Sequence, residues 1–132
     1  VTPVQAENAC RLVGKRLCTE AEWQAACGGP SNFLYPYGNT YSTTACNGLD
    51  LGRNAIGNTG SFSACQGGYP GLWDMSGNVY EFATNGAVIR AKGGSFRSGA
   101  GAGLLRCNTG FDWTSGGPDA VVGFRCCRNR DP

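Results

Sequence analysis

The sequence predicts one α+β domain, rich in loops and stapled by disulfides, that takes in all of residues 1–132. Two helix-start signatures stand in the first 30 residues, and short β-prone runs separated by glycines follow Asn78. The chain contains eight cysteines, 22 glycines and 6 prolines, while only 15% of its residues are charged. Such a composition is typical of a turn-rich fold that cross-links stabilise.

Two short helices are expected near the start of the chain. Thr2 is placed to cap a helix over about 3–13, and Gln5 stands three residues after it, where it can complete a capping box. This helix is expected to bury one apolar stripe, formed by Val4, Ala9, Leu12 and Val13. The segment Thr19-Glu20-Ala21-Glu22 repeats the capping pattern and predicts a second helix that ends at Gly28-Gly29-Pro30.

Short antiparallel strands are expected in the second half of the chain. They are the β-prone runs bounded by Gly-rich turns, at Val79–Phe82, Val88–Ala91, Ser95–Phe96 and Val121–Cys126. Residues 30–72 show little periodicity, but they contain cysteines and several aromatic side chains. Because disordered segments usually lack both, an ordered loop is favoured there.

Charge and residue type exclude several classes of function. With 11 basic and 9 acidic residues the net charge is +2, and no run of like charges indicates binding to nucleic acid or to an anionic membrane. The chain has no histidine, which removes catalytic triads and metal centres built on imidazole. No apolar run approaches the roughly 20 residues of a membrane-spanning helix.

The cysteines favour disulfides over a metal site. Their number is even, and no Cys-x-x-Cys pair of the kind used by structural zinc sites and thioredoxin-like motifs occurs. Disulfides persist in oxidising compartments. An extracytoplasmic location, whether secreted, periplasmic or on the cell surface, is therefore expected.

Three sequence fragments together resemble a known family. They are Gly14-Lys15-Arg16-Leu17 with Thr19-Glu20-Ala21-Glu22-Trp23, then Asp74-Met75-Ser76-Gly77-Asn78-Val79 with Glu81, then Gly93-Gly94-Ser95-Phe96 with Gly123-Phe124-Arg125. In this order and spacing they are similar to the formylglycine-generating enzyme, or sulfatase-modifying factor, family. The resemblance implies the formylglycine-generating-enzyme subtype of the C-type-lectin fold.

Domains of that family usually begin with several strands before the first helix seen here. The resemblance therefore implies a sulfatase-modifying-factor-like domain without those N-terminal strands. The apolar faces that such strands cover would then be open to a partner chain or to self-assembly.

The same resemblance bears on catalysis. Oxidising members of the family hold copper with two cysteines shortly after the Gly-Gly-Ser element, and soft thiolates suit Cu(I). The matching positions here are Ser98 and approximately Gly103, and neither is a thiol. The family's oxidase activity is therefore not expected, and no catalytic residue is assigned.

The resemblance also implies two disulfides, Cys10 with Cys126 and Cys27 with Cys107. Four cysteines remain, and we expect them to pair as Cys46–Cys65 and Cys18–Cys127.

A structural calcium site is expected around two carboxylates. Asp74 and Glu81 flank a glycine turn whose carbonyls can face inward, as a hard cation that binds six to eight oxygens requires. By resemblance to family relatives the ligands are Asp74, Gly77, Val79 and Glu81. The alternative is that Asp74 caps a turn and Glu81 lies on a solvated strand. Two further oxygen donors, Asn47 and Asp50, are candidates for part of a second site.

These observations favour a non-catalytic ligand-binding or adhesion module on a calcium- and disulfide-stabilised scaffold, with an unknown protein or glycan ligand. Six residues lie where the family places its ligand face: Phe96, Arg97, Ser98, Phe111, Asp112 and Trp113. Aromatic and arginine side chains commonly anchor recognition surfaces, although Trp113 fits the core equally well. The alternatives are a structural subunit of a surface assembly or fibre, and a formylglycine-generating oxidase-like enzyme.

Overall fold

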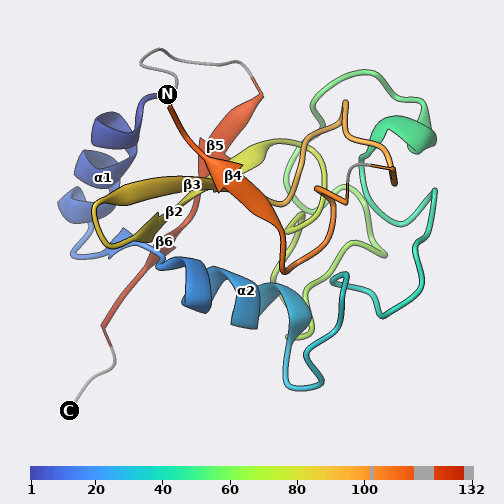
Figure 1. Cartoon of the computed structure of the whole chain (residues 1–132), viewed down its shortest axis with the longest axis horizontal. Helices are drawn as coiled ribbons and strands as arrows, with labels where there is room; N and C mark the ends of the chain where they lie inside the picture. Colours follow the sequence, from blue (N-terminus) through green and yellow to red (C-terminus); the bar gives the residue numbers. More distant parts are fainter. Residues whose placement is uncertain (102, 115–120, 130–132) are drawn as a thin grey trace.

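The computed structural model describes residues 1–101, 103–114 and 121–129 (Figure 1). Its helices and strands follow the chain in this order: α1 (Pro3–Leu12), β1 (Arg16–Leu17), α2 (Glu20–Gly28), the 3-10 helix η1 (Leu49–Leu51), β2 (Tyr80–Asn85), β3 (Val88–Lys92), β4 (Gly110–Asp112), β5 (Val122–Phe124) and β6 (Cys126–Cys127). The α+β class is thereby confirmed.

Both helices begin at the predicted capping boxes. The Thr2 hydroxyl accepts from the Gln5 amide, and the Gln5 side chain accepts from the Thr2 amide. Thr19 and Glu22 form the same reciprocal pair at the start of α2. These contacts satisfy amides that have no partner within the helix, which is why the local sequence predicts the helix starts well.

The predicted apolar stripe of α1 is wrong. The side chains that face the core are the small ones of Ala6 and Cys10. The helix is held on that side by the disulfide of Cys10, so its larger apolar residues turn outward. The exposed residues are Val4, Ala9, Leu12 and Val13.

A four-stranded sheet forms the centre of the fold, in the order β4-β3-β2-β5. Strands β2, β3 and β4 are antiparallel, but β5 runs parallel to β2. Strands β1 and β6 form a separate antiparallel pair. The strand expected at Ser95–Phe96 is wrong, since Ser95 to Ser98 form a turn closed by the Ser98 amide donating to the Ser95 carbonyl. The run 121–126 divides between β5 and the start of β6.

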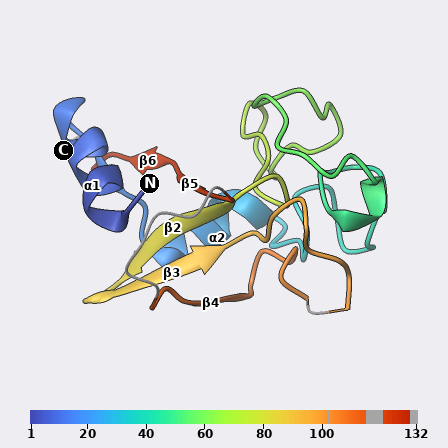
Figure 2. The ribbon, with the colours of Figure 1, turned by 90° about the horizontal axis from the view of Figure 1, so that it is seen from above.

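The two faces of the sheet pack against different helices because side chains alternate along each strand. Phe82 of β2 points toward α1 and packs with Ala6 and Cys10. Its neighbour Ala83 points toward α2 and packs with Trp23. Figures 1 and 2 show the two helices on opposite sides of the sheet.

Loops form the other half of the molecule (Figure 2). The structure describes every residue from 29 to 79, and η1 is the only helix or strand among them. Gly77 is needed where this half meets the sheet, since its φ is 73° and a Cβ there would lie 2.5 Å from the Asn47 carbonyl oxygen. A third small core surrounds Cys46 and Cys65.

The structure contains four disulfides, which leave none of the eight cysteines free. They join the pairs proposed from the sequence: Cys10–Cys126, Cys18–Cys127, Cys27–Cys107 and Cys46–Cys65. Within the described residues, no helix is long and apolar enough to cross a membrane.

Candidate functional site

The expected ligand face is only partly exposed. Arg97 is exposed, and its guanidinium carbon lies 5.0 Å from the centre of the Phe96 ring. Phe96 itself is 9% exposed, so it supports Arg97 more than it presents a surface of its own. Phe111 is half-buried and meets the half-buried Tyr80 ring edge to face at 5.1 Å. Tyr80 is a neighbour that sequence analysis missed, because it lies on β2 and not on the C-terminal loops.

Ser98 lies inside the turn that follows Gly93-Gly94. Its hydroxyl accepts from the Ser95 amide at 3.0 Å and lies 3.3 Å from the Tyr80 hydroxyl. The residue is buried, so these contacts give its hydroxyl a structural role. Ser98 nonetheless joins the Tyr80–Phe111 pair to the turn that carries Arg97.

The other two residues of the expected face lie elsewhere. Asp112 is exposed, but it points to the α2 side of the sheet, where its carboxylate pairs with Arg90 at 2.8 Å. Trp113 packs edge to face on Phe82 at 5.2 Å and belongs to the α1 side of the core. The core interpretation of Trp113 therefore fits the structure better than an exposed anchor does.

A second candidate site is a pocket of about 250 Å³ beside the end of the loop half. Its lining includes Asp74, Val79, Glu81 and Arg125. The sequence predicts the first three as ligands of one site, and the structure brings them to one pocket. Gly77, the remaining predicted ligand, is not among the lining residues.

Arg125 dominates the electrostatics of this pocket. Its guanidinium donates to both oxygens of Glu81, at 2.6 and 2.8 Å, and to the Trp73 carbonyl at 2.8 Å. The Trp23 indole donates to the same carboxylate at 2.9 Å. Glu81 is therefore a buried, fully paired carboxylate, and the solvated-strand interpretation of it is wrong.

Asp74 is the less satisfied carboxylate. It is 5% exposed; one oxygen accepts from the Gly60 amide at 2.9 Å, and the other is buried without a hydrogen-bond partner. Burial raises the pKa of Asp74, and the negative charge of Glu81 raises it further, while the Gly60 amide and Arg125 act in the opposite direction.

This donor set fits a divalent cation in part. The unpaired Asp74 oxygen and the neighbouring Val79 can serve as ligands, whereas Glu81 would have to share its oxygens with Arg125. Among the residues that the structure describes, no group of three or more His, Cys, Asp or Glu side chains is arranged to hold a metal.

The residues proposed for a second cation site have separate partners. Asn47 is fully buried; its amide group donates to Asn78 and to the Ala55 carbonyl, and its carbonyl oxygen has no partner. Asp50 is exposed and accepts from the Tyr41 hydroxyl at 2.6 Å. Asn47 thus serves mainly to join Ala55 and Asn78 within the loop half.

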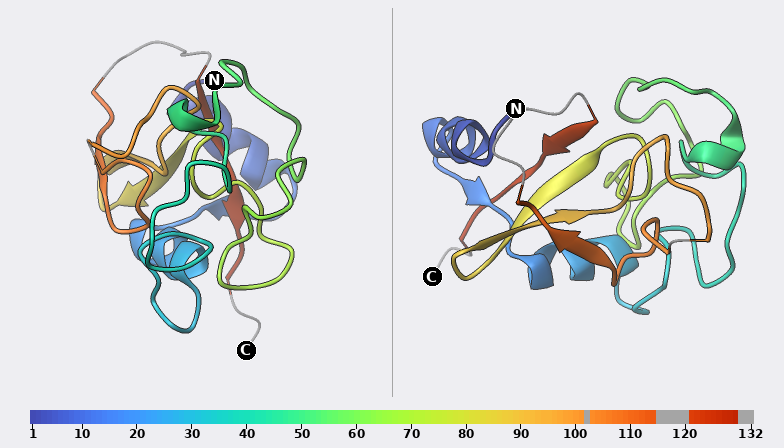
Figure 3. Two further views of the ribbon diagram at one scale, coloured as in Figure 1. Left: turned by 90° about the vertical axis from the view of Figure 1, so that its right-hand side faces the viewer. Right: turned by 45° about the horizontal axis from the view of Figure 1, so that its top comes forward.

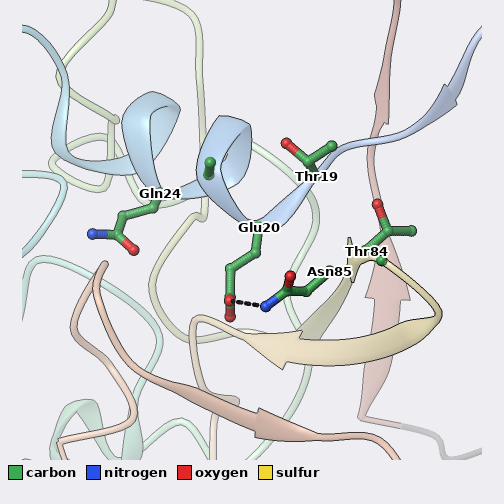
Figure 4. A pocket seen from close by; sticks show the side chains of 7 residues that line it. Thr19, Glu20, Gln24, Thr84 and Asn85 are labelled. Atoms are coloured by element: carbon green, nitrogen blue, oxygen red, sulfur yellow. Dashed lines mark hydrogen bonds between the residues drawn. The ribbon is translucent and has the colours of Figure 1, made fainter.

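A further pocket of about 360 Å³ lies between the start of α2 and the β2–β3 turn. Figure 4 shows Glu20 at its centre, where it accepts from Asn85 at 3.3 Å. Burial acts to raise the pKa of Glu20, but Arg90 and Lys92 outweigh it and hold that pKa below its usual range. No sequence signal predicts this pocket, because its two walls are about 60 residues apart in the chain.

Comparison with known proteins identifies the family. The sequence model of one protein family, the sulfatase-modifying factor enzyme 1-like domain, matches residues 1–130. The chain belongs to this family. The resemblance in motifs and the expected fold subtype are thereby confirmed.

Two curated relatives are similar over much of the chain. The serine/threonine-protein kinase pkn1 of Chlamydia caviae is 30% identical to this chain over 97% of the chain. The formylglycine-generating enzyme of Mus musculus is 35% identical over 58% of the chain. In both comparisons the chain spans 23% of the relative.

Solved structures share the fold. The Treponema denticola variable protein 1 matches 87% of the chain with a TM-score of 0.73 at 22% identity, and the chain covers 48% of it. PvdO from Pseudomonas aeruginosa matches 94% with a TM-score of 0.73 at 21% identity, with 58% of that protein covered. The sulfatase-modifying-factor fold thus recurs in proteins with different names, so function must be argued from the site.

Proposed function

We propose that this domain is a non-catalytic, extracytoplasmic ligand-binding module. The observation that carries the proposal is that all eight cysteines are in disulfides. By the resemblance, Ser98 and approximately Gly103 stand where the oxidases have their copper-binding thiols. A thiolate pair for copper has no source among these cysteines. Four disulfides are also typical of proteins that fold in an oxidising compartment.

The surface that supports ligand binding best is centred on Arg97. Its guanidinium has no carboxylate partner among the described residues, so it is available to an acceptor on a ligand. The turn that carries it is fixed by the hydrogen bonds of Ser95 and Ser98. The Tyr80–Phe111 pair supplies neighbouring aromatic surface. A rigid cation beside aromatic rings suits an anionic or hydrogen-bond-accepting group of a protein or glycan.

Exchange of Arg97 for alanine is expected to weaken ligand binding at least tenfold, since hot-spot arginines contribute about 2 kcal/mol or more. The ligand is sought on a glycan array and a panel of extracellular proteins, and the affinity of Arg97→Ala is then measured. Arg106→Ala is the matched control, because Arg106 is also exposed but does not lie in the Arg97 turn.

Equal affinity of the Arg97→Ala variant and the native domain would rule out this surface. The oxidase alternative is tested separately by incubating a Cys-x-Pro-x-Arg peptide with the domain, copper and oxygen. Conversion of the peptide cysteine to formylglycine would contradict the non-catalytic assignment.

We further propose that calcium stabilises the scaffold at the pocket of Asp74. Asp74 and the Val79 carbonyl would hold the ion, with Glu81 contributing as far as Arg125 allows. The ion would supply positive charge next to a carboxylate oxygen that otherwise has no partner.

Calcium at a concentration a hundredfold above its dissociation constant is expected to stabilise the domain by about 2.7 kcal/mol, which raises the melting temperature by several degrees. The Asp74→Asn variant should lose this shift. Glu7→Gln removes an exposed carboxylate on α1 and should keep it. A melting temperature that is the same in calcium and in chelator would contradict the calcium proposal and leave the binding surface untouched.

A further inference from the structure

The turn between α1 and β1 presents large apolar side chains to solvent. Leu12 is 87% exposed, the highest value among the described large hydrophobic residues, and its neighbour Val13 is 65% exposed. Figure 2 shows α1 at the edge of the molecule opposite the loop half. Neither side chain belongs to an apolar core of the residues that the structure describes, which raises the question of what they contact.

Three exposed cations lie close to these residues along the chain or across the β1–β6 pair. Arg11 precedes Leu12 and Lys15 follows Val13 closely. The pairing of Arg16 with Cys127 brings Arg128 next to Lys15 across the β1–β6 ladder. None of the three has an ion-pair partner within the described part of the chain, whereas Arg16 is held by Glu22 at 2.7 Å. We name this surface the α1–β1 tip: Arg11, Leu12, Val13, Lys15 and Arg128.

Two disulfides constrain the tip, from Cys10 to Cys126 and from Cys18 to Cys127. Figure 3 shows the C-terminal segment (red) beside β1 (blue), as the β1–β6 pairing requires. The backbone turns tightly, with the Gly14 amide donating to the Arg11 carbonyl at 3.0 Å and the Lys15 amide donating to the Cys10 carbonyl at 2.9 Å. A surface that is already ordered loses little conformational entropy when it binds.

We propose that the α1–β1 tip docks this domain on the surface of a bilayer rich in anionic phospholipid. Leu12 and Val13 enter the boundary between head groups and acyl chains, while the three cations contact lipid phosphates. Apolar side chains bordered by lysine and arginine are the pattern of interfacial membrane binding. The sequence gives no sign of an anionic-membrane site because these cations form no run; the β1–β6 pairing brings Arg128 next to Lys15. The contact is peripheral and adds an attachment surface to the ligand-binding module.

The charges on the tip argue against a second copy as the occupant. A two-fold contact centred on the tip would bring Arg11, Lys15 and Arg128 close to the three cations of the other chain. Lipid is favoured over an acidic protein because the two pockets described above are lined by other residues, so neither of them lies at the tip to hold a side chain of a protein partner. An anionic bilayer offers negative head groups to the three cations and an apolar interior to Leu12 and Val13.

The test is vesicle flotation with phosphatidylglycerol–phosphatidylcholine mixtures and with phosphatidylcholine alone. The native domain should float with the anionic vesicles and not with the neutral ones, and raising the salt concentration should weaken binding. The variant Lys15→Glu/Arg128→Glu should bind at least tenfold more weakly, and Leu12→Ser/Val13→Ser should lose a comparable amount.

Matched control variants carry the same kinds of substitution at exposed positions outside the tip. Arg53→Glu/Arg106→Glu alters the net charge equally at exposed positions outside the tip, and Leu49→Ser/Ile56→Ser removes two other exposed apolar side chains. Both should retain most of the binding. Near-ultraviolet circular dichroism and the absence of free thiols establish that each variant is folded.

Three results would overturn the proposal. They are failure of the native domain to float with anionic vesicles, equal binding to neutral vesicles, and equal loss in the tip and control variants. Binding to polyglutamate without binding to vesicles would assign the tip to an acidic protein and likewise reject the lipid assignment.

Discussion

Reduction of all four disulfides is expected to unfold the domain at room temperature. Regular structure is sparse: from residue 29 to residue 79, all of which the structure describes, only η1 is helix or strand. The three apolar cores are small, and each contains cysteines of at least one bridge. The disulfides thus replace a large continuous core as the main constraint on the chain.

The size of the effect follows from the loops that the bridges close. Three of them join residues 116, 109 and 80 positions apart, and the fourth spans 19. In the chain-entropy model a loop of about 15 residues contributes about 3 kcal/mol and one of about 100 residues about 4.7 kcal/mol. Even allowing for non-additivity, loss of all four removes a stabilisation comparable to the 5–15 kcal/mol of a typical domain.

Near-ultraviolet circular dichroism with and without a phosphine reductant measures this effect, and the signal of the three tryptophans should collapse on reduction. Single bridges do not rank by sequence separation, because the remaining bridges shorten the loops. With Cys18–Cys127 intact, Cys10–Cys126 closes a loop of only about ten residues, whereas Cys46–Cys65 spans 19. Cys10→Ser/Cys126→Ser is therefore expected to lower the free energy of unfolding no more than Cys46→Ser/Cys65→Ser does. A reduced protein with an unchanged spectrum would show that the apolar cores suffice without the bridges.

Local signals in the sequence predict local structure well here. The capping boxes at Thr2 and Thr19 depend on contacts three residues apart, and both helices begin where these boxes indicate. The short strands β1 and β4 escaped prediction, because two or three residues carry no alternation pattern. The buried face of α1 was also mispredicted, since a disulfide to a residue 116 positions away selects that face.

For the candidate site too, residues close together in the sequence are predicted well and contacts between distant residues are not. Asp74, Val79 and Glu81 are close in sequence, and the structure brings them to one pocket. Arg125, which neutralises Glu81, lies 44 residues further along the chain and was expected only as part of a motif. The ligand face depended on which loop residues are exposed, and burial of Phe96 and Ser98 is set by tertiary packing that no local pattern encodes.

Exchange of Arg125 for methionine is expected to destabilise the domain by about 3–5 kcal/mol, because it leaves the Glu81 carboxylate buried without its cation. Glu81 has a side-chain exposure of 8% and Arg125 one of 25%. Loss of the guanidinium also frees the Trp73 carbonyl that it holds at 2.8 Å. The free energy of unfolding is obtained by urea denaturation with the disulfides intact.

A second ion pair in the same domain supplies the control. Arg16 donates to both oxygens of Glu22, at 2.7 and 2.8 Å, in the same two-pronged geometry, but both side chains are 38% exposed. Solvent screens such a pair, so Arg16→Met should cost at most about 1 kcal/mol. Comparison of the two variants separates the effect of burial from that of the arginine–carboxylate contact itself.

The double variant Glu81→Gln/Arg125→Met shows why Arg125→Met loses stability. If the cost of Arg125→Met comes from an uncompensated charge, removal of that charge should restore part of the lost stability, since a glutamine can still accept from the Trp23 indole. The measurements are made in chelator, so that no divalent cation takes the place of the guanidinium. A double variant no more stable than Arg125→Met would indicate that Arg125 stabilises the domain through packing and its bond to Trp73.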